Sequence, residues 1–299
     1  MSTKVRNIIV GGLICLLLSS CGVTGKQISI GGKNFTEQYL LSEMTAFLLK
    51  EEGYNVKQMN NLGSTVVRTA LENQQVDLMW EYTGTALITY LGEEPIKDPN
   101  KAFDRVKEVD GKNGIIWMNQ SDVNNTYALA MNREDAEELS IISISDLADY
   151  VREHPGDLTI ASDAEFANRP DGLPGVEDTY GFEFGINQVK LMDIGLTQRA
   201  LEDGQVDVSV AYETDATIKA YDLVVLKDDQ QFFPPYRAAV AINEKTYEQY
   251  PELKEITAKI GEKLNSDIMR ELNYRVDIEG NPVSIVAYDW LVENGLVED

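Results

Sequence analysis

One segment of this chain occurs twice, 130 residues apart, and this repeat restricts the possible folds. Residues 70–82 read ALENQQVDLMWEY and residues 200–212 read ALEDGQVDVSVAY. Each copy predicts a helix end, a polar turn and a short apolar strand that ends in a tyrosine. Solenoid repeats recur at roughly 20–50 residues, so the long spacing instead indicates two similar α/β lobes. Ligands of open α/β sheets bind beyond the carboxyl ends of the strands, where Tyr82 and Tyr212 are expected.

The rest of the chain alternates strand and helix patterns, which predicts α/β sheets covered by helices. Thr36 is expected to cap a helix that runs to about residue 52, and Ser64 to cap the helix of the first repeat copy. A loop is expected at 168–175, and residues 252–292 should be mostly helical.

Two polar or proline-rich segments are expected to carry the chain between the lobes. Asn124 ends the first lobe, and the paired prolines at 234 and 235 stiffen the return, since proline fixes its own backbone angle. Residues 27–124 and 235–299 would then form a discontinuous lobe 1, and residues 125–234 a continuous lobe 2. This organisation predicts a clamshell with a hinge of two crossings.

The first 20 residues have the pattern of a lipoprotein signal peptide. Two basic residues, Lys4 and Arg6, precede an apolar run at 8–18, which is shorter than the roughly 20 residues that span a bilayer. Leu-Ser-Ser-Cys at 18–21 resembles a lipobox, so Cys21 is expected to be lipidated and residues 21–26 to form a tether. Removal of the signal also removes Cys15, which leaves no cysteine pair for a disulfide.

The composition excludes several classes of function. The chain has 50 acidic and 26 basic residues and a formal net charge of −24, which argues against binding nucleic acid. Its single histidine, His154, is expected at a helix end, so imidazole catalysis and thiolate or imidazole metal sites are nearly excluded, and no cofactor is expected. Glu81 and Glu213 are the candidate pair for an acidic hydrolase, although structural roles are favoured. Asp77 and Asp207 are expected to stabilise turns.

Four tyrosines stand where they could face a single cleft. Tyr82 and Tyr212 end the repeated strands, and Tyr127 and Tyr236 flank the two crossings. Aromatic faces from two lobes suit a quaternary ammonium group, which has no N–H to donate and is held by ring quadrupoles and contact area. We therefore predict that these four residues form an aromatic box.

Several motifs also resemble one family, the substrate-binding proteins of ABC importers for osmoprotectants such as glycine betaine, carnitine and choline. The similar segments follow the same order along almost the whole chain after the signal: residues 31–38, 61–65, 81–85, 169–175, 221–226 and 232–236. The resemblance implies a type II periplasmic-binding-protein fold with two mixed sheets. It also implies that the tyrosine box binds the ligand cation, that Lys33 and Arg169 hold a ligand carboxylate, and that Thr85 supplies a pocket hydroxyl.

These features together predict a receptor and not an enzyme. We expect an extracytoplasmic, lipid-anchored monomer that captures a quaternary-ammonium solute and delivers it to a membrane permease with its ATPase. Zwitterions should bind better than choline, because choline leaves Lys33 and Arg169 uncompensated. The alternatives are a receptor for another cationic solute, such as a polyamine or an amino acid, and a secreted acidic hydrolase.

Overall fold

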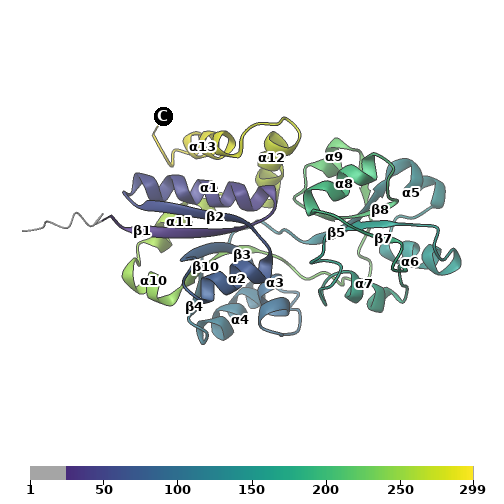
Figure 1. The fold of residues 1–299 in the computed structure, drawn as a ribbon, viewed down its shortest axis with the longest axis horizontal. Coiled ribbons are helices and arrows are strands. Elements are labelled where there is room, and N and C mark those ends of the chain that lie inside the picture. Colours follow the sequence, from purple (N-terminus) through teal and green to yellow (C-terminus); the bar gives the residue numbers. More distant parts are fainter. Residues whose placement is uncertain (1–24, 299) are drawn as a thin grey trace, which may run out of the picture.

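The computed structural model describes residues 25–298, which form two α/β lobes, each built on one five-stranded mixed sheet (Figure 1). The first sheet has the order β2-β1-β3-β10-β4 and the second the order β7-β6-β8-β5-β9. The predicted fold class is confirmed. The strands of the first sheet are β1 (Gln27–Lys33), β2 (Asn55–Leu62), β3 (Leu78–Tyr82), β4 (Ile115–Met118) and β10 (Ala238–Asn243). Those of the second are β5 (Tyr127–Asn132), β6 (Ile160–Ser162), β7 (Val189–Leu191), β8 (Val208–Tyr212) and β9 (Leu223–Val225).

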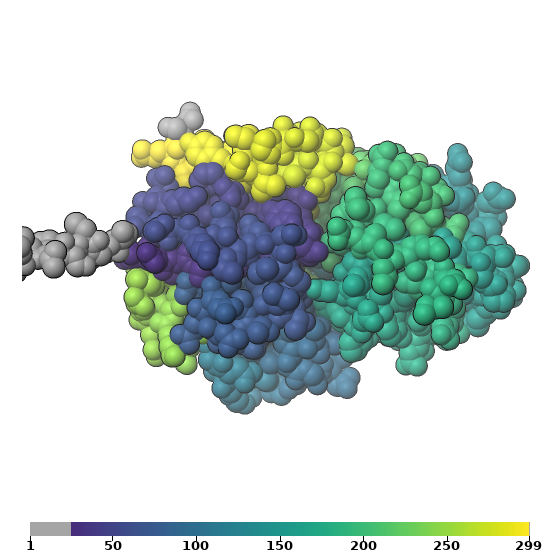
Figure 2. Space-filling view, in the orientation of Figure 1, coloured from purple at the N-terminus to yellow at the C-terminus, as the bar shows by residue number. Residues whose placement is uncertain are grey.

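Helices cover both sheets. Around the first sheet lie α1 (Thr36–Glu51), α2 (Ser64–Glu72), α3 (Thr83–Thr85), the π-helix η1 (Ala86–Tyr90), α4 (Pro99–Gly111), α10 (Glu244–Gln249), α11 (Leu253–Gly261), α12 (Ser266–Asp277) and α13 (Val283–Glu293). Around the second lie α5 (Arg133–Leu139), α6 (Ile144–Glu153), α7 (Leu173–Tyr180), α8 (Ile194–Glu202) and α9 (Thr217–Ala220). In Figure 2 the yellow C-terminal helices lie on the purple and blue lobe. No helix within residues 25–298 has the length and apolar character needed to cross a bilayer.

The repeated segment forms equivalent elements in the two lobes. Its two strands are β3 and β8; every residue of both is buried, as expected for strands with helices on both faces. The Asp77 carboxylate accepts hydrogen bonds from the backbone N–H and the hydroxyl of Ser29, at 2.7 and 2.6 Å. Asp207 accepts the same two bonds from Thr159, both at 2.7 Å. Both aspartates therefore have structural partners, but these partners lie on a distant segment of the same lobe, whereas the sequence predicted a role in the turn before each strand.

Antiparallel strands make both sheets mixed. β10 pairs antiparallel with β3 and β4, and β5 pairs antiparallel with β8 and β9. β10 therefore returns the chain to the first sheet after the second is complete. The register of β5 and β8 sets Tyr127 opposite Tyr212, which brings two of the four selected tyrosines together at one end of the second sheet.

The two crossing segments are hydrogen-bonded to each other. The backbone N–H of Asn125 donates to the carbonyl of Tyr236 at 3.0 Å, and the side chain of Asn124 accepts from the Tyr236 N–H at 2.7 Å. The hydroxyl of Thr126 donates to the carbonyl of Pro234 at 3.2 Å. The limits of the lobes stay a proposal: the first segment of lobe 1 ends at Asn124, and the chain returns to lobe 1 at Pro235.

Three local expectations differ from the structure. The N-caps of α1 and α2 are Phe35 and Gly63, so Thr36 and Ser64 are the first helical residues and not the caps. The hydroxyl of Thr36 is used elsewhere, in a hydrogen bond to Asp277. α7 begins at Leu173, inside the expected loop, because Pro174 is tolerated in the first turn, where its missing N–H needs no partner.

Candidate functional site

A cavity at the junction of the lobes is lined by all seven residues that the sequence selected for ligand binding. They are Lys33, Tyr82, Thr85, Tyr127, Arg169, Tyr212 and Tyr236. Tyr82 and Tyr212 stand at the ends of the central strands β3 and β8, while Tyr127 begins β5 and Tyr236 precedes β10. Strand ends from both sheets thus supply the walls, as the repeat predicted. The role of these residues in binding stays a prediction.

The aromatic walls form a continuous series of contacting rings. Tyr82 stacks on Phe35 with ring centroids 6.2 Å apart, and Phe35 lies 5.2 Å from Tyr212. Tyr212 lies 5.1 Å from Tyr127, which meets Tyr236 edge to face at 5.4 Å. The four tyrosines and Phe35 together are called the aromatic box from here on, which is one ring more than the sequence predicted. Phe35, which follows the glycine pair of the 31–38 motif, was not selected from the sequence, although it connects the rings of the two lobes.

Hydrogen bonds fix two of the box tyrosines. The Tyr82 hydroxyl donates to Glu37 at 2.6 Å and accepts from Gln38 at 2.9 Å, and the Tyr236 hydroxyl donates to Asp171 at 2.6 Å. Burial raises the pKa of both phenols well above the usual value, so both remain neutral donors. Gly84 allows this packing, since a Cβ there would lie 2.7 Å from the Tyr236 ring.

Lys33 and Arg169, expected to be free for a ligand carboxylate, are already paired. The Lys33 ammonium lies 2.5 Å from the Glu81 carboxylate, and both side chains are almost fully buried. The Arg169 guanidinium donates to Asp171 through Nε at 2.9 Å and through Nη2 at 2.6 Å. Both cations therefore keep a counter-charge when choline binds. The predicted preference for zwitterions assumed that choline would leave these cations unpaired, and that premise is wrong.

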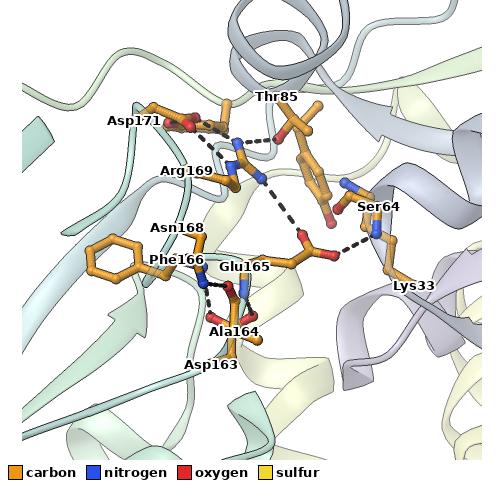
Figure 3. A network of polar contacts seen from close by, with 12 residues as sticks. Lys33, Ser64, Thr85, Asp163, Ala164, Glu165, Phe166, Asn168, Arg169 and Asp171 are labelled. Atoms are coloured by element: carbon orange, nitrogen blue, oxygen red, sulfur yellow. Dashed lines mark hydrogen bonds and ion pairs between the residues drawn. The ribbon is translucent and has the colours of Figure 1, made fainter. Parts of the chain in front are cut away.

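Arg169 also joins the two lobes. Its Nη2 lies 3.4 Å from the Thr85 hydroxyl (Figure 3). Its guanidinium lies 5.6 Å from the centroid of Tyr127. Burial by itself would lower the pKa of Arg169, but Tyr127 and the Asp171 carboxylate raise it well above the ordinary value. The guanidinium is therefore charged at every accessible pH.

The candidate hydrolase pair is not assembled. The Glu81 carboxylate is bound by Lys33 and by the Tyr90 hydroxyl, which donates to it at 2.7 Å. Glu213 is exposed beside the proline-rich crossing, where it lines a separate surface hollow with Pro234 and Pro235. Both acids thus have the structural surroundings that the sequence favoured over catalysis.

A second cavity, of about 270 Å³, adjoins the first and shares Phe35 and Tyr212 with it. Its acidic lining supports the box. Asp215 accepts from the Tyr212 N–H at 2.8 Å, and burial raises the pKa of Asp215 to about 7. Burial also raises the pKa of Glu37, although the hydrogen bond from Tyr82 opposes this shift. Acids behind the rings thus hold two box tyrosines in place.

The first cavity is small in this arrangement of the lobes. Its volume of about 20 Å³ has room for roughly one water molecule. A solute with a trimethylammonium group is much larger, so the rings or the lobes must move apart before such a solute can enter. The site as it stands is closed on its own side chains.

Known proteins resemble this chain over most of its length. A sequence profile for the OpuAC family, described as the substrate binding domain of ABC-type glycine betaine transport system, matches residues 26–293. A glycine-betaine-binding protein of Pseudomonas aeruginosa is 42% identical over 293 residues, which cover 96% of this chain and 94% of that protein. The carnitine transport binding protein OpuCC of Listeria monocytogenes is 35% identical over 294 residues, covering 95% of this chain and 94% of that protein.

A solved structure gives the same result for the fold. A crystal structure named as a glycine betaine/carnitine/choline ABC transporter superposes with a TM-score of 0.70 at 34% identity and covers 90% of this chain and 99% of that one. The profile match, the two relatives and the shared two-lobed architecture agree, and this chain belongs to the family of substrate-binding domains of ABC-type glycine betaine transport systems.

Proposed function

We propose that this protein binds quaternary-ammonium compatible solutes, such as glycine betaine, carnitine or choline, between its lobes and delivers them to a membrane permease. The observation that carries the proposal is the aromatic box, whose rings come from both lobes. Ring faces attract a cation through their quadrupoles and need no hydrogen-bond donor from it, which suits a fully methylated nitrogen. The names of the relatives support the same class of ligand.

The ion pairs around the box favour a positive charge in the ligand. Lys33 and Arg169 are matched by Glu81 and Asp171, and the cavity lining adds the carboxyl groups of Asp163 and Glu165. The box therefore offers an environment of net negative charge, in which a cation is attracted by both the rings and the acids. No covalent chemistry is proposed, and the protein is expected to return each solute unchanged.

Calorimetric titration with glycine betaine, carnitine and choline tests this proposal. We expect saturable binding of about one solute per protein, while a polyamine or an amino acid with free N–H groups should bind at least about tenfold more weakly. The reason is that the aromatic faces cannot accept the hydrogen bonds that such nitrogens lose on leaving water. Turnover of any of these solutes, or tightest binding of the polyamine, would contradict the proposal.

We further propose that the mature protein is a monomer that is held at the outer face of the cell membrane by acyl chains on Cys21. Cys21 lies outside the described residues, and the proposal rests on the signal pattern before it. Replacing Cys21→Ser should release the protein from the membrane fraction into the soluble fraction. The variant lacks the acyl chains, and stable anchoring in a bilayer takes about two of them. Fractionation followed by immunoblotting measures this. An unchanged membrane fraction for the variant would rule out lipidation at this residue.

A further inference from the structure

The Glu165 side chain crosses from one lobe to the other at the edge of the box. Glu165 lies in the loop between β6 and α7 of lobe 2, yet its Oε1 accepts a hydrogen bond at 2.6 Å from the backbone N–H of Ser64 in lobe 1 (Figure 3). Asp163 orients the loop, because its carboxylate accepts the N–H groups of Glu165 and Phe166, both at 3.2 Å. Glu165 is therefore aimed across the cleft by its own loop.

The acceptor site on lobe 1 is the uncapped start of a helix. Ser64 is the first residue of the nine-residue α2, and the N-cap, Gly63, has no side chain to satisfy the free N–H groups. Helix starts of this kind favour a negative charge, because several N–H groups and the helix dipole point outward. The carboxylate that fills this position comes from the other lobe.

The second oxygen of Glu165 faces the remaining edge of Arg169. The Asp171 carboxylate accepts hydrogen bonds from Nε and Nη2 of the guanidinium, while Nη1 lies 3.8 Å from Glu165 Oε2. The Glu165 carboxylate thus lies between a helix N-terminus and an arginine, two groups that bind carboxylates strongly. Its side chain keeps 35% exposure, so part of it faces solvent.

We propose that Glu165 is an internal substitute for a solute carboxylate: it joins the lobes when no solute is bound and must be displaced by any solute that carries an acid group. This rests on the proposed function, since it concerns the same cleft. Both donors that Glu165 uses line the cavity, and the cavity has room for about one water while Glu165 is in place. A solute acid group and the Glu165 carboxylate would repel each other there.

The consequence is a difference between solute classes. A zwitterion such as glycine betaine must push Glu165 from Ser64 and Arg169 before its own carboxylate can take these donors. Choline has no acid group, so Glu165 can stay in place and its charge adds to the attraction for the ammonium group. Glu165 is therefore a residue that determines specificity, and it favours simple cations over zwitterions.

Calorimetry with Glu165→Gln tests this directly. The substitution keeps the shape and one acceptor oxygen but removes the charge. We expect the ratio of betaine to choline affinity to rise by about tenfold, the change expected when one charge-assisted contact is altered. The matched control is Glu183→Gln, which removes an exposed charge from the same lobe and should leave the ratio unchanged. An unchanged ratio in Glu165→Gln, or an equal rise in the control, would refute a role for Glu165 in specificity.

Small-angle scattering of the solute-free protein gives a readout that is independent of binding. Glu165→Ala removes the link to Ser64, so its radius of gyration should exceed that of the wild type. The substitution does not alter the residues of α12 that contact lobe 2, such as Arg270, which donates to the Glu213 carbonyl, and Asn273, which donates to the Thr214 carbonyl, so these contacts limit how far the lobes part. If wild-type protein binds neither solute, the proposed function fails, and scattering alone then decides whether Glu165 joins the lobes. Equal radii of gyration for the variant and the wild type would show that Glu165 does not join the lobes.

Discussion

Replacing Arg68→Ala should lower the free energy of unfolding by about 3–5 kcal/mol, the cost of leaving one member of a buried ion pair without its partner. Arg68 on α2 binds Asp110 on α4 through two hydrogen bonds, of 2.6 and 2.5 Å, and the Asp110 side chain is fully buried. Without Arg68, the hydrogen bond of 2.7 Å from the indole of Trp117 is the main remaining support of the Asp110 charge. A neutral alanine cannot compensate that charge.

Urea titration followed by tryptophan fluorescence measures this loss, and the chain provides a matched control. Arg105 also donates two hydrogen bonds to a carboxylate, that of Glu93, at 3.0 and 2.7 Å, but both side chains are about one-third exposed. Arg105→Ala should therefore cost less than about 1 kcal/mol, as is usual for surface pairs. If the two variants lose the same stability, burial does not determine the importance of the Arg68–Asp110 pair.

Replacing Tyr127→Ala should weaken binding of glycine betaine or choline by about a hundredfold, because the variant loses about 2–3 kcal/mol of ring–cation and ring–ring attraction. Tyr127 is the most connected ring of the aromatic box. Its centroid lies 4.9 Å from Phe166, 5.1 Å from Tyr212 and 5.4 Å from Tyr236. Removal of this ring both opens the box and frees its neighbours to move.

Tyr127→Phe is the control for the hydroxyl, and we expect it to change affinity by less than about threefold. Burial raises the pKa of the Tyr127 phenol, and nearby charges modify this shift. No hydrogen bond from residues 25–298 contributes to the shift. The same substitution at Tyr82 or Tyr236 is less informative, because it breaks bonds to Glu37 or Asp171. Equal losses for the Phe and Ala variants of Tyr127 in calorimetry would show that its hydroxyl, and not its face, binds the solute.

The sequence by itself determined the architecture and the aromatic residues. The repeat at 70–82 and 200–212 is a local pattern of helix end, turn and strand, and such patterns follow from side-chain period and turn chemistry. Since β3 and β8 occupy equivalent places in their sheets, the strand-end positions of Tyr82 and Tyr212 followed from the pattern. The caps were misplaced by one residue, because Phe35 and Gly63 have extended backbones without side-chain caps.

Only the tertiary structure decided how the charged groups are used. Lys33 and Glu81 are 48 residues apart and meet because β1 lies beside β3; Ser64 and Glu165 are 101 residues apart and meet only where the two lobes touch. Phe35 joins the aromatic box for the same reason, since its ring fills the space between Tyr82 of one lobe and Tyr212 of the other. A side chain's type shows what it can bind, but its partner depends on strand order and lobe contact, and these arise from packing along the whole chain.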